Sequence, residues 1–410
     1  MLLALQYVLP ESCQSGMDGL RQAIARLQGM YLPISHWESF VFPARVTDYK
    51  KDMLDLLCAS GEAVWFGRKE EGEKDGRIAF YLTESKELLA AEGRVSSPSS
   101  EPELLDLLRR KGASFLTGLS RDTGYAPSEL MERLMRLVWE GRVSNDQFAP
   151  IRLHGTGSGA KTSRKGFQSG LGRWYAVAAA DAEPGAGMAA FGSAAAATEE
   201  ISPEKMVVAW VHHLLQSFGI ITRDVIAKHV PGETDRLQDT IRKLEDWGML
   251  ARGFWIHGLS YMQVAAPDTV ERLRQLNVQA DGQTVVLSSV DPANPYGALL
   301  KWPERQKVAF ARKPGNFLVF RRGRWVLWIE NNGKRFVTID TEWLKAESGE
   351  AEVVLEAVRV MLRQSGLRKI VVDSWNGAAV PRTEAAELFR RIGAESDRDA
   401  FVLWPSSLRG

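Results

Sequence analysis

The feature that most constrains the fold of this chain is a unit that occurs three times. In each copy, a segment with apolar residues at helical spacing ends at a glycine and is followed by two strand-like segments. The three glycines are Gly61, Gly141 and Gly248. Helices that lead into a β-hairpin are typical of a winged helix, and three copies in one chain indicate this structure more strongly than one copy would.

The sequence therefore predicts an α+β chain that begins with tandem winged-helix domains. They are expected over residues 12–95, 100–180 and 201–275. An Ala/Gly-rich stretch over residues 181–200 predicts a flexible linker between the second and the third domain. Because winged helices also serve as packing or protein-contact modules, the repeat alone leaves a purely structural role open.

Beyond residue 280 the pattern changes to strands. The dipeptide Asn332-Gly333 lies between two strand-like segments and is a strong signal for a two-residue hairpin. We expect a β-meander that belongs to a β-barrel-like module over residues 280–345. Helical and strand-like segments then alternate, which predicts a small α/β part over residues 346–410.

A local excess of positive charge lies in residues 301–335. The whole chain has a formal net charge of only +1, but this segment contains ten basic and two acidic residues, a net charge of +8. Aromatic residues such as Phe310 and Trp325 are interleaved with the basic ones. Basic side chains contact phosphates and aromatic rings stack on unpaired bases, so the segment predicts contact with DNA. A solvated sheet face over an aromatic core would give the same pattern.

A second basic element is the Gly/Ser/Lys loop expected between the strands of the second winged helix. Its composition suits a loop that follows a phosphate backbone, and equally a disordered polar loop. The two basic elements together provide the candidate DNA-binding residues. They are Lys161, Arg164, Lys165, Arg305, Lys307, Arg312, Lys313, Arg321, Arg322, Arg324 and Trp325.

The same loop contains a segment, residues 155–162, that resembles a phosphate-binding P-loop. The pattern requires glycine before the lysine, but Ala160 precedes Lys161, and the flanking residues do not form a buried strand. We therefore do not expect the chain by itself to be an ATPase. The two cysteines and six histidines form no metal-spaced cluster, so neither a metal nor a cofactor is predicted.

The stretch Asp291–Gly297 is a stiff loop, because Pro292 and Pro295 each fix a backbone angle. Asp291 is the best single candidate for a catalytic residue. A carboxylate held beside a flipped nucleotide can activate water or stabilise a cationic sugar during base excision. The alternative is that Asp291 bonds nearby backbone amides and only holds the turn.

No apolar run of the sequence approaches the ~18 residues of a membrane-spanning helix. The first residues are mildly apolar but lack the basic start and the cleavage site of a signal peptide. With only two cysteines, the chain is expected in the reducing cytoplasm, without a membrane partner.

Several short segments resemble the C-terminal region of bacterial large helicase-related (Lhr) proteins. They are residues 26–29, 32–33, 37–38, 43–46, 60–65, 109–115, 137–141 and 291–297. The resemblance implies part of a superfamily-2 DNA-repair helicase in which tandem winged helices and a β-barrel module follow an ATPase core. It also implies similarity to the AlkZ/YcaQ group of DNA glycosylases, with links to uracil removal and oligomer formation. The chain departs from that pattern because it has no ATPase core and because Met30 breaks the AlkZ-type motif near Gln28.

These observations predict a DNA-binding accessory module of the Lhr type that binds single-stranded or forked DNA through its winged helices and its basic β module. One alternative is a DNA glycosylase that excises a flipped base such as uracil. A second alternative is a scaffold that forms homo-oligomers or recruits a separate helicase polypeptide. The expected partners are accordingly DNA, a separate helicase or ATPase polypeptide, and further copies of the chain.

Overall fold

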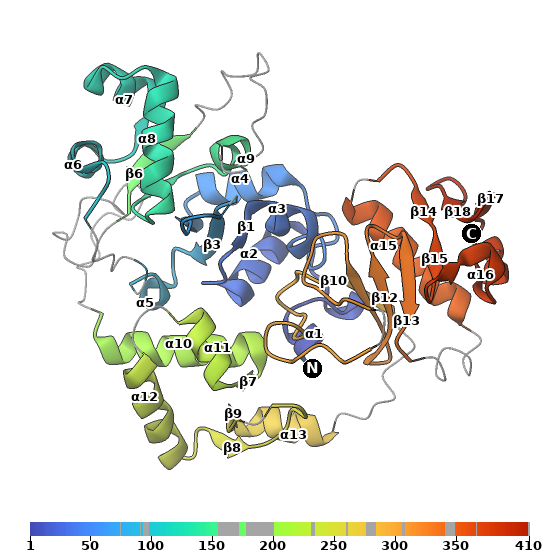
Figure 1. The fold of residues 1–410 in the computed structure, drawn as a ribbon. Helices are drawn as coiled ribbons and strands as arrows, with labels where there is room; N and C mark the ends of the chain where they lie inside the picture. The colour runs from blue at the N-terminus through green and yellow to red at the C-terminus, as the bar shows by residue number, and fades with distance from the viewer. Residues whose placement is uncertain are drawn as a thin grey trace.

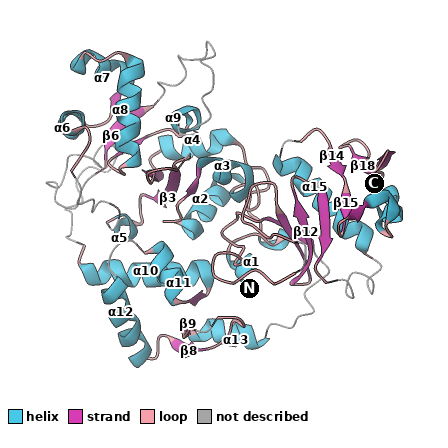
Figure 2. Cartoon of the chain, in the orientation of Figure 1, coloured by secondary structure: helices cyan, strands magenta, loops and turns pink. Residues whose placement is uncertain are grey.

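The computed structural model describes residues 1–73, 75–90, 92, 98–154, 172–177, 201–230, 234–259, 261–275, 284–305, 308–340, 349–365 and 367–408. Within these ranges the chain forms three small helical domains and one larger domain built on a sheet (Figure 1). Figure 2 shows that the largest group of strands lies in this fourth, C-terminal unit, which we call the sheet domain.

The three N-terminal domains repeat one order of elements: a helix, a short strand, two further helices and a β-hairpin. The first comprises α2 (Gly16–Leu27), β1 (Leu32–Pro33), α3 (Ile34–His36) with the π-helix η2 (Trp37–Val41), α4 (Lys51–Ala59), β2 (Ala63–Arg68) and β3 (Arg77–Leu82). The second comprises α6 (Pro102–Lys111), β4 (Ser114–Phe115), α7 (Leu116–Thr123), α8 (Pro127–Trp139), β5 (Val143–Asn145), α9 (Ala149–His154) and β6 (Arg173–Ala176). The third comprises α10 (Pro203–Phe218), β7 (Ile220–Ile221), α11 (Arg223–His229), α12 (Thr234–Asp246), β8 (Ala251–Gly253) and β9 (Gln263–Ala265).

In each of these three sheets the last strand lies between the other two and pairs antiparallel with both. This shared topology confirms the predicted tandem winged helices. In the described part of the chain, four short helical segments flank these domains: α1 (Leu2–Leu5), η1 (Pro10–Ser12), α5 (Lys86–Leu89) and α13 (Pro267–Gln275). A further short helix, η5 (Val380–Arg382), lies within the sheet domain.

The glycine at the end of the third helix has a physical role in every copy. Gly61, Gly141 and Gly248 have φ angles of 79°, 72° and 72°, in the left-handed region that is strained for a residue with a Cβ atom. The amide of Arg142 donates to the carbonyl of Leu137 at 2.9 Å, and Met249 and Leu244 form the equivalent bond, also at 2.9 Å. These bonds satisfy helix-terminal carbonyls and turn the chain into the hairpin.

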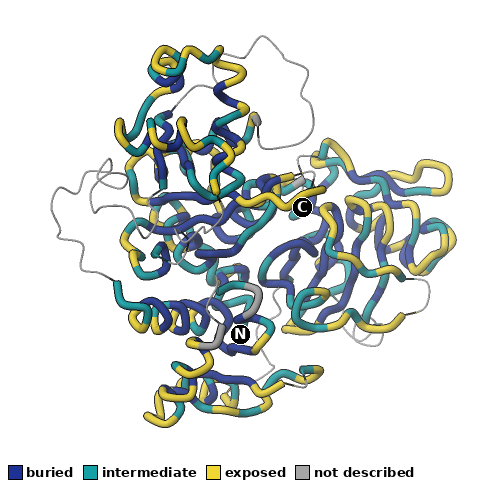
Figure 3. Tube along the Cα trace, turned by 60° about the vertical axis from the view of Figure 1, so that its left-hand side comes forward, coloured by how far each residue is buried: buried dark blue, intermediate teal, exposed yellow. Residues whose placement is uncertain are grey.

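The three winged helices pack around one continuous apolar core. Trp37 and Trp65 of the first domain, Trp174 of the second and Leu214 of the third are all buried in it. A hydrogen bond also joins the first two domains, since the Ser144 hydroxyl donates to the Trp65 carbonyl at 2.8 Å. The first domain lies at the centre, between the second, the third and the sheet domain (Figure 1), and Figure 3 shows that buried residues continue across these junctions.

His213 joins the third domain to the first. It lies on α10, it is buried, and its Nε2 donates to the carbonyl of Gln28 at 2.9 Å. Burial lowers the pKa of His213 from 6.5 to about 4, and the bond to Gln28 opposes this shift only in part. The neutral ring is therefore the form that fits the folded protein.

We expect the free energy of unfolding to fall by about 3 kcal/mol through His213 as the pH decreases from 6.5 to 4. The folded-state pKa is the lower one, so the unfolded chain binds the extra proton in this window and acid favours unfolding. Thermal unfolding at several pH values would measure the effect. His213→Gln should weaken the dependence on pH, and an unchanged profile in this variant would contradict the assignment.

The sheet domain contains a six-stranded mixed sheet with the order β10-β11-β12-β13-β15-β16. Its strands are β10 (Thr284–Ser288), β11 (Phe317–Arg321), β12 (Arg324–Glu330), β13 (Arg335–Thr338), β15 (Ser374–Trp375) and β16 (Ala378–Ala379). A second, three-stranded sheet has the order β14-β18-β17, with β14 (Ile370–Val372), β17 (Glu395–Asp397) and β18 (Ala400–Leu403). The helices α15 (Glu350–Ser365) and α16 (Ala385–Arg391) share a core with both sheets.

The predicted β-barrel is not confirmed, because the described strands form an open sheet with β10 and β16 at its edges. The meander and the C-terminal part, which we expected as separate units, instead share this sheet. The reason is the parallel pairing of β13 with β15, which requires a long crossover, and the connection between these strands includes α15. The linker predicted over residues 181–200 lies outside the described residues.

Among the described residues, no helix has both the length and the apolar character needed to cross a lipid bilayer.

Candidate nucleic-acid interface

Asp291 lies in the loop after β10, and its side chain is completely buried. Its two carboxylate oxygens accept hydrogen bonds from Nη1 and Nη2 of Arg45, both at 2.8 Å, and Arg45 is also fully buried. Oδ1 accepts a further bond from the backbone amide of Ala293 at 2.8 Å. Asp291 therefore holds its own turn and joins the sheet domain to the first winged helix.

Arg45 also connects this ion pair to the start of the chain. Its Nη1 donates to the carbonyl of Val41 at 2.9 Å, and its Nη2 donates to Oε1 of Gln6 at 3.2 Å. Gln6 in turn donates to the carbonyl of Ser217 on α10 at 3.1 Å. One buried network thus links the N-terminal segment, the first and third winged helices and the sheet domain.

The loop is held from its other side by Arg312, which was predicted to contact DNA. Its Nη1 donates to the carbonyls of Asn294 and Tyr296 at 2.7 and 3.2 Å, and its Nη2 donates to those of Asp291 and Val290 at 2.9 and 3.2 Å. Burial lowers the pKa of Arg312, although the charge of Asp291 opposes this shift. These four bonds commit Arg312 to the conformation of the loop.

Two other predicted DNA-binding residues also have structural contacts. The Arg321 side chain is 11% exposed; its guanidinium donates to the Thr284 hydroxyl at 2.9 Å and pairs with Glu352 at 3.3 Å. Trp325 is 8% exposed, and its indole nitrogen donates to the carbonyl of Leu327 at 2.8 Å. Only a small part of either side chain is available to a ligand.

The remaining candidates divide into exposed residues and residues outside the described ranges. Arg305, Lys313, Arg322 and Arg324 are exposed. Arg305 donates to the carbonyl of Ile339 at 3.3 Å, and Arg324 pairs with Asp340 at 3.3 Å while its side chain stays 59% exposed. Lys161, Arg164, Lys165 and Lys307 lie outside the described residues, so their predicted contacts stay predictions.

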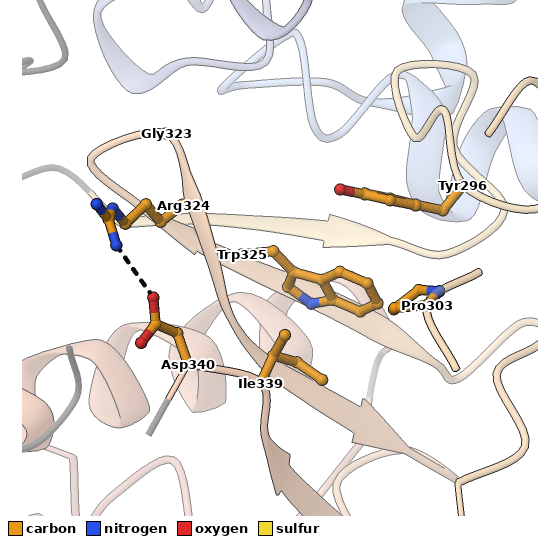
Figure 4. A pocket seen from close by; sticks show the side chains of 7 residues that line it. All are labelled: Tyr296, Pro303, Gly323, Arg324, Trp325, Ile339 and Asp340. Atoms are coloured by element: carbon orange, nitrogen blue, oxygen red, sulfur yellow. Dashed lines mark hydrogen bonds and ion pairs between the residues drawn. The ribbon is translucent and has the colours of Figure 1, made fainter. Parts of the chain in front are cut away.

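The Asp291–Gly297 loop leads directly into a cluster of aromatic rings. Tyr296 and Phe310 both stack on Trp302, with ring centroids 5.9 and 5.6 Å away, and the Trp325 ring lies 4.9 Å from Tyr296. Gly297 permits this arrangement, because it has a φ of 71° and a Cβ atom there would lie 2.4 Å from the Trp302 indole nitrogen. An open pocket of about 700 Å³ adjoins the cluster at the turn between β11 and β12 (Figure 4).

The sequence analysis missed a group of exposed apolar side chains on the third winged helix. They follow the end of α12 or lie on the β8–β9 wing: Trp247, Met249, Phe254, Tyr261 and Met262. Trp247 is 71% exposed and Phe254 is 66% exposed. Their signal is weak because apolar residues without helical or alternating spacing do not indicate burial or exposure.

The position of Asp291 can be compared with its two predicted roles, that of a catalytic residue and that of a residue that only holds the turn. Its carboxylate has no exposed surface and is paired with Arg45, so in this arrangement it does not reach a nucleotide at the surface. The turn-holding alternative accounts for every contact that the carboxylate makes. Within the described ranges, no group of three or more His, Cys, Asp and Glu side chains is placed to hold a metal ion.

Comparisons with known proteins match the first and the third winged-helix domain of the chain. Residues 1–83 and residues 200–285 each match the winged-helix domain of large helicase-related proteins. The chain is 32% identical over 406 residues to the Lhr helicase/uracil glycosylase of Escherichia coli (strain K12), covering 93% of this chain and 26% of that protein. It is 34% identical over 385 residues to the Lhr helicase/probable uracil glycosylase of Mycolicibacterium smegmatis, covering 89% of this chain and 25% of that protein. The chain thus spans about a quarter of the length of these curated relatives.

Proposed function

We propose that this chain, a relative of the large helicase-related (Lhr) proteins, is a DNA-binding module for single-stranded or forked DNA. Two of its segments match the winged-helix domains of these proteins. The observation that carries the proposal is the row of three winged helices with one topology. A helix and a hairpin wing from each domain offer several contacts along one DNA strand or fork. Such a module would serve DNA repair together with an ATPase.

The exposed surfaces of the chain support binding to unpaired DNA. Arg305, Arg322 and Arg324 supply positive charge at the sheet domain. Trp247 and Phe254 expose aromatic rings at the wing of the third domain. Aromatic rings stack on bases only where those bases are accessible, which favours single strands and forks over intact duplex.

We expect the chain to bind a forked or single-stranded oligonucleotide at least tenfold more tightly than a blunt duplex of the same sequence. The physical reason is that stacking contributes about 1–3 kcal/mol for each accessible base. Fluorescence anisotropy with the three labelled substrates at low salt would measure the three dissociation constants. Equal affinity for all three would contradict the preference, and no detectable binding would contradict the proposed function.

A second candidate function is the removal of uracil from DNA, and the names of the two relatives favour it. Both relatives are about four times as long as this chain, so the activity must be tested here directly. Incubation with a uracil-containing oligonucleotide, followed by alkali, would cleave the strand wherever the base has been removed. A thymine-containing oligonucleotide is the control, and an intact uracil strand would end this candidate.

Asp291→Asn would locate the chemistry if uracil is removed. Because Asp291 is buried against Arg45, we expect the variant to keep activity in proportion to its folded fraction. A variant that unfolds like the original protein but is inactive would instead assign the chemistry to Asp291.

Partners other than DNA belong to the proposal as well. The exposed apolar side chains of the third wing could also contact a separate helicase polypeptide or a second copy of this chain. Light scattering over a range of protein and salt concentrations would measure self-association. A large oligomer that resists salt and does not bind DNA would favour the scaffold alternative.

A further inference from the structure

The pocket at the β11–β12 turn combines apolar walls with one charged edge (Figure 4). Tyr296, Pro303, Trp325 and Ile339 line it with apolar surface. Arg324 and Asp340 form its charged edge, where Nη1 and Oδ2 lie 3.3 Å apart. A planar aromatic ligand with polar groups on one edge matches this arrangement.

The walls are rigid before any ligand arrives. The indole of Trp325 is fixed by its hydrogen bond to the carbonyl of Leu327, and its ring packs against Tyr296, with the ring centroids 4.9 Å apart. Trp302 stacks on Tyr296 at an interplanar angle of 18° and also contacts Trp325, with ring centroids 6.0 Å apart. A ligand that stacks here therefore loses little affinity to the ordering of side chains.

The charged edge places a hydrogen-bond donor beside an acceptor. The guanidinium of Arg324 can only donate and the carboxylate of Asp340 can only accept. The Watson–Crick edge of every nucleobase carries an acceptor next to a donor, so any base can pair with this edge. A base in a duplex already uses those groups, so the pocket distinguishes unpaired from paired DNA without selecting a sequence.

A second pocket, of about 610 Å³, shares the Pro303 wall with the first. Trp302 and Phe310 provide its aromatic surface, and the exposed Arg305 stands at its side. Two adjoining aromatic pockets, each with an exposed arginine, provide places for two successive nucleotides of one strand.

We propose that the pocket lined by Tyr296, Pro303, Trp325 and Ile339 binds one unpaired nucleobase of DNA, stacked on the half-buried Tyr296 ring. Arg324 and Asp340 pair to the Watson–Crick edge of this base, and Arg305 contacts the strand beside it. This inference rests on the proposed DNA binding and names the part of the DNA that the sheet domain recognises. It requires no bond to form or break. The binding energy comes from stacking and from pairing to the polar edge.

The test compares a single-stranded oligothymidylate with an abasic oligomer of the same length, which has the same phosphates but no bases. The original protein should bind the oligothymidylate about 5- to 150-fold more tightly, which is the effect of 1–3 kcal/mol from one stacked base. Tyr296→Leu and Asp340→Ala should each lower this ratio, and Tyr296→Leu should leave the affinity for the abasic oligomer unchanged. Trp404→Leu, which alters an aromatic residue of the same domain outside the pocket, should keep the original ratio.

The outcomes separate this inference from the proposed function. Salt-dependent binding of both oligomers with equal affinity would overturn the nucleobase pocket and leave DNA binding intact. A ratio that survives in both Tyr296→Leu and Asp340→Ala, with thermal unfolding as in the original protein, would place base recognition elsewhere. Failure to bind either oligomer would overturn both proposals.

Discussion

Replacing Asp291 with alanine is expected to lower the free energy of unfolding by about 3–5 kcal/mol, because the substitution leaves the charge of Arg45 buried without its partner. Both side chains are completely buried and make two hydrogen bonds at 2.8 Å. Arg45 cannot turn toward solvent without breaking its bonds to Val41 and Gln6. The loss should therefore separate the sheet domain from the first winged helix before the whole chain unfolds.

Thermal unfolding and amide hydrogen exchange would measure this effect, and exchange should accelerate first in the Asp291–Gly297 loop. Asp399→Ala is the matched control, because Asp399 forms an ion pair with Arg382 at 3.0 Å but is largely exposed. Removing such a surface pair changes stability by at most about 1 kcal/mol. If the two variants unfold alike, the Arg45–Asp291 pair does not hold the domains together.

Reversing the charge of Arg305, Arg322 and Arg324 to glutamate is expected to weaken single-stranded DNA binding about 100-fold at 0.1 M salt. Each lost phosphate contact reduces the slope of log affinity against log salt by about 0.7, so three contacts reduce it by about 2. These three arginines are exposed. Arg312 and Arg321 are left unchanged, since their contacts stabilise the loop and the sheet.

The matched control reverses Arg382, Arg390 and Arg391 instead, which are exposed on or near α16. This variant has the same change in net charge, so any loss that comes from total charge alone would appear in it too. Anisotropy titrations at several salt concentrations would compare the two triple variants. An equal loss of affinity in both would show that the charge of the β11–β12 region has no special role.

The local parts of the fold were predictable because local rules govern them. Gly61, Gly141 and Gly248 each end a helix, because the positive φ at this position favours glycine. The spacing of the apolar residues before each glycine defines the buried face of that helix. The three winged helices follow from this signal together with the two strand-like segments after each glycine. The strands β11, β12 and β13 were also predictable, because strand-like segments joined by short turns, such as the one at Asn332-Gly333, indicate hairpins.

The remaining features depend on contacts between distant residues. The pairing of β13 with β15 decides between a barrel and an open sheet, and no local pattern encodes it. The same holds for Asp291, because its partner Arg45 is 246 positions away. Charge alone could not distinguish Arg312 and Arg321 from the exposed Arg305 and Arg324. Only the folded chain shows that Arg312 and Arg321 are partly buried and that they bond to the Asp291–Gly297 loop and to Thr284, respectively.

The dependence of single-stranded DNA affinity on salt tests the central claim, that this chain is a DNA-binding module, most directly. The expected result is a straight line of log affinity against log salt, with a slope of about −2 or steeper if the three exposed arginines of the sheet domain each contact a phosphate. Binding that is undetectable at low salt, or an affinity that does not change as salt rises, would contradict the claim.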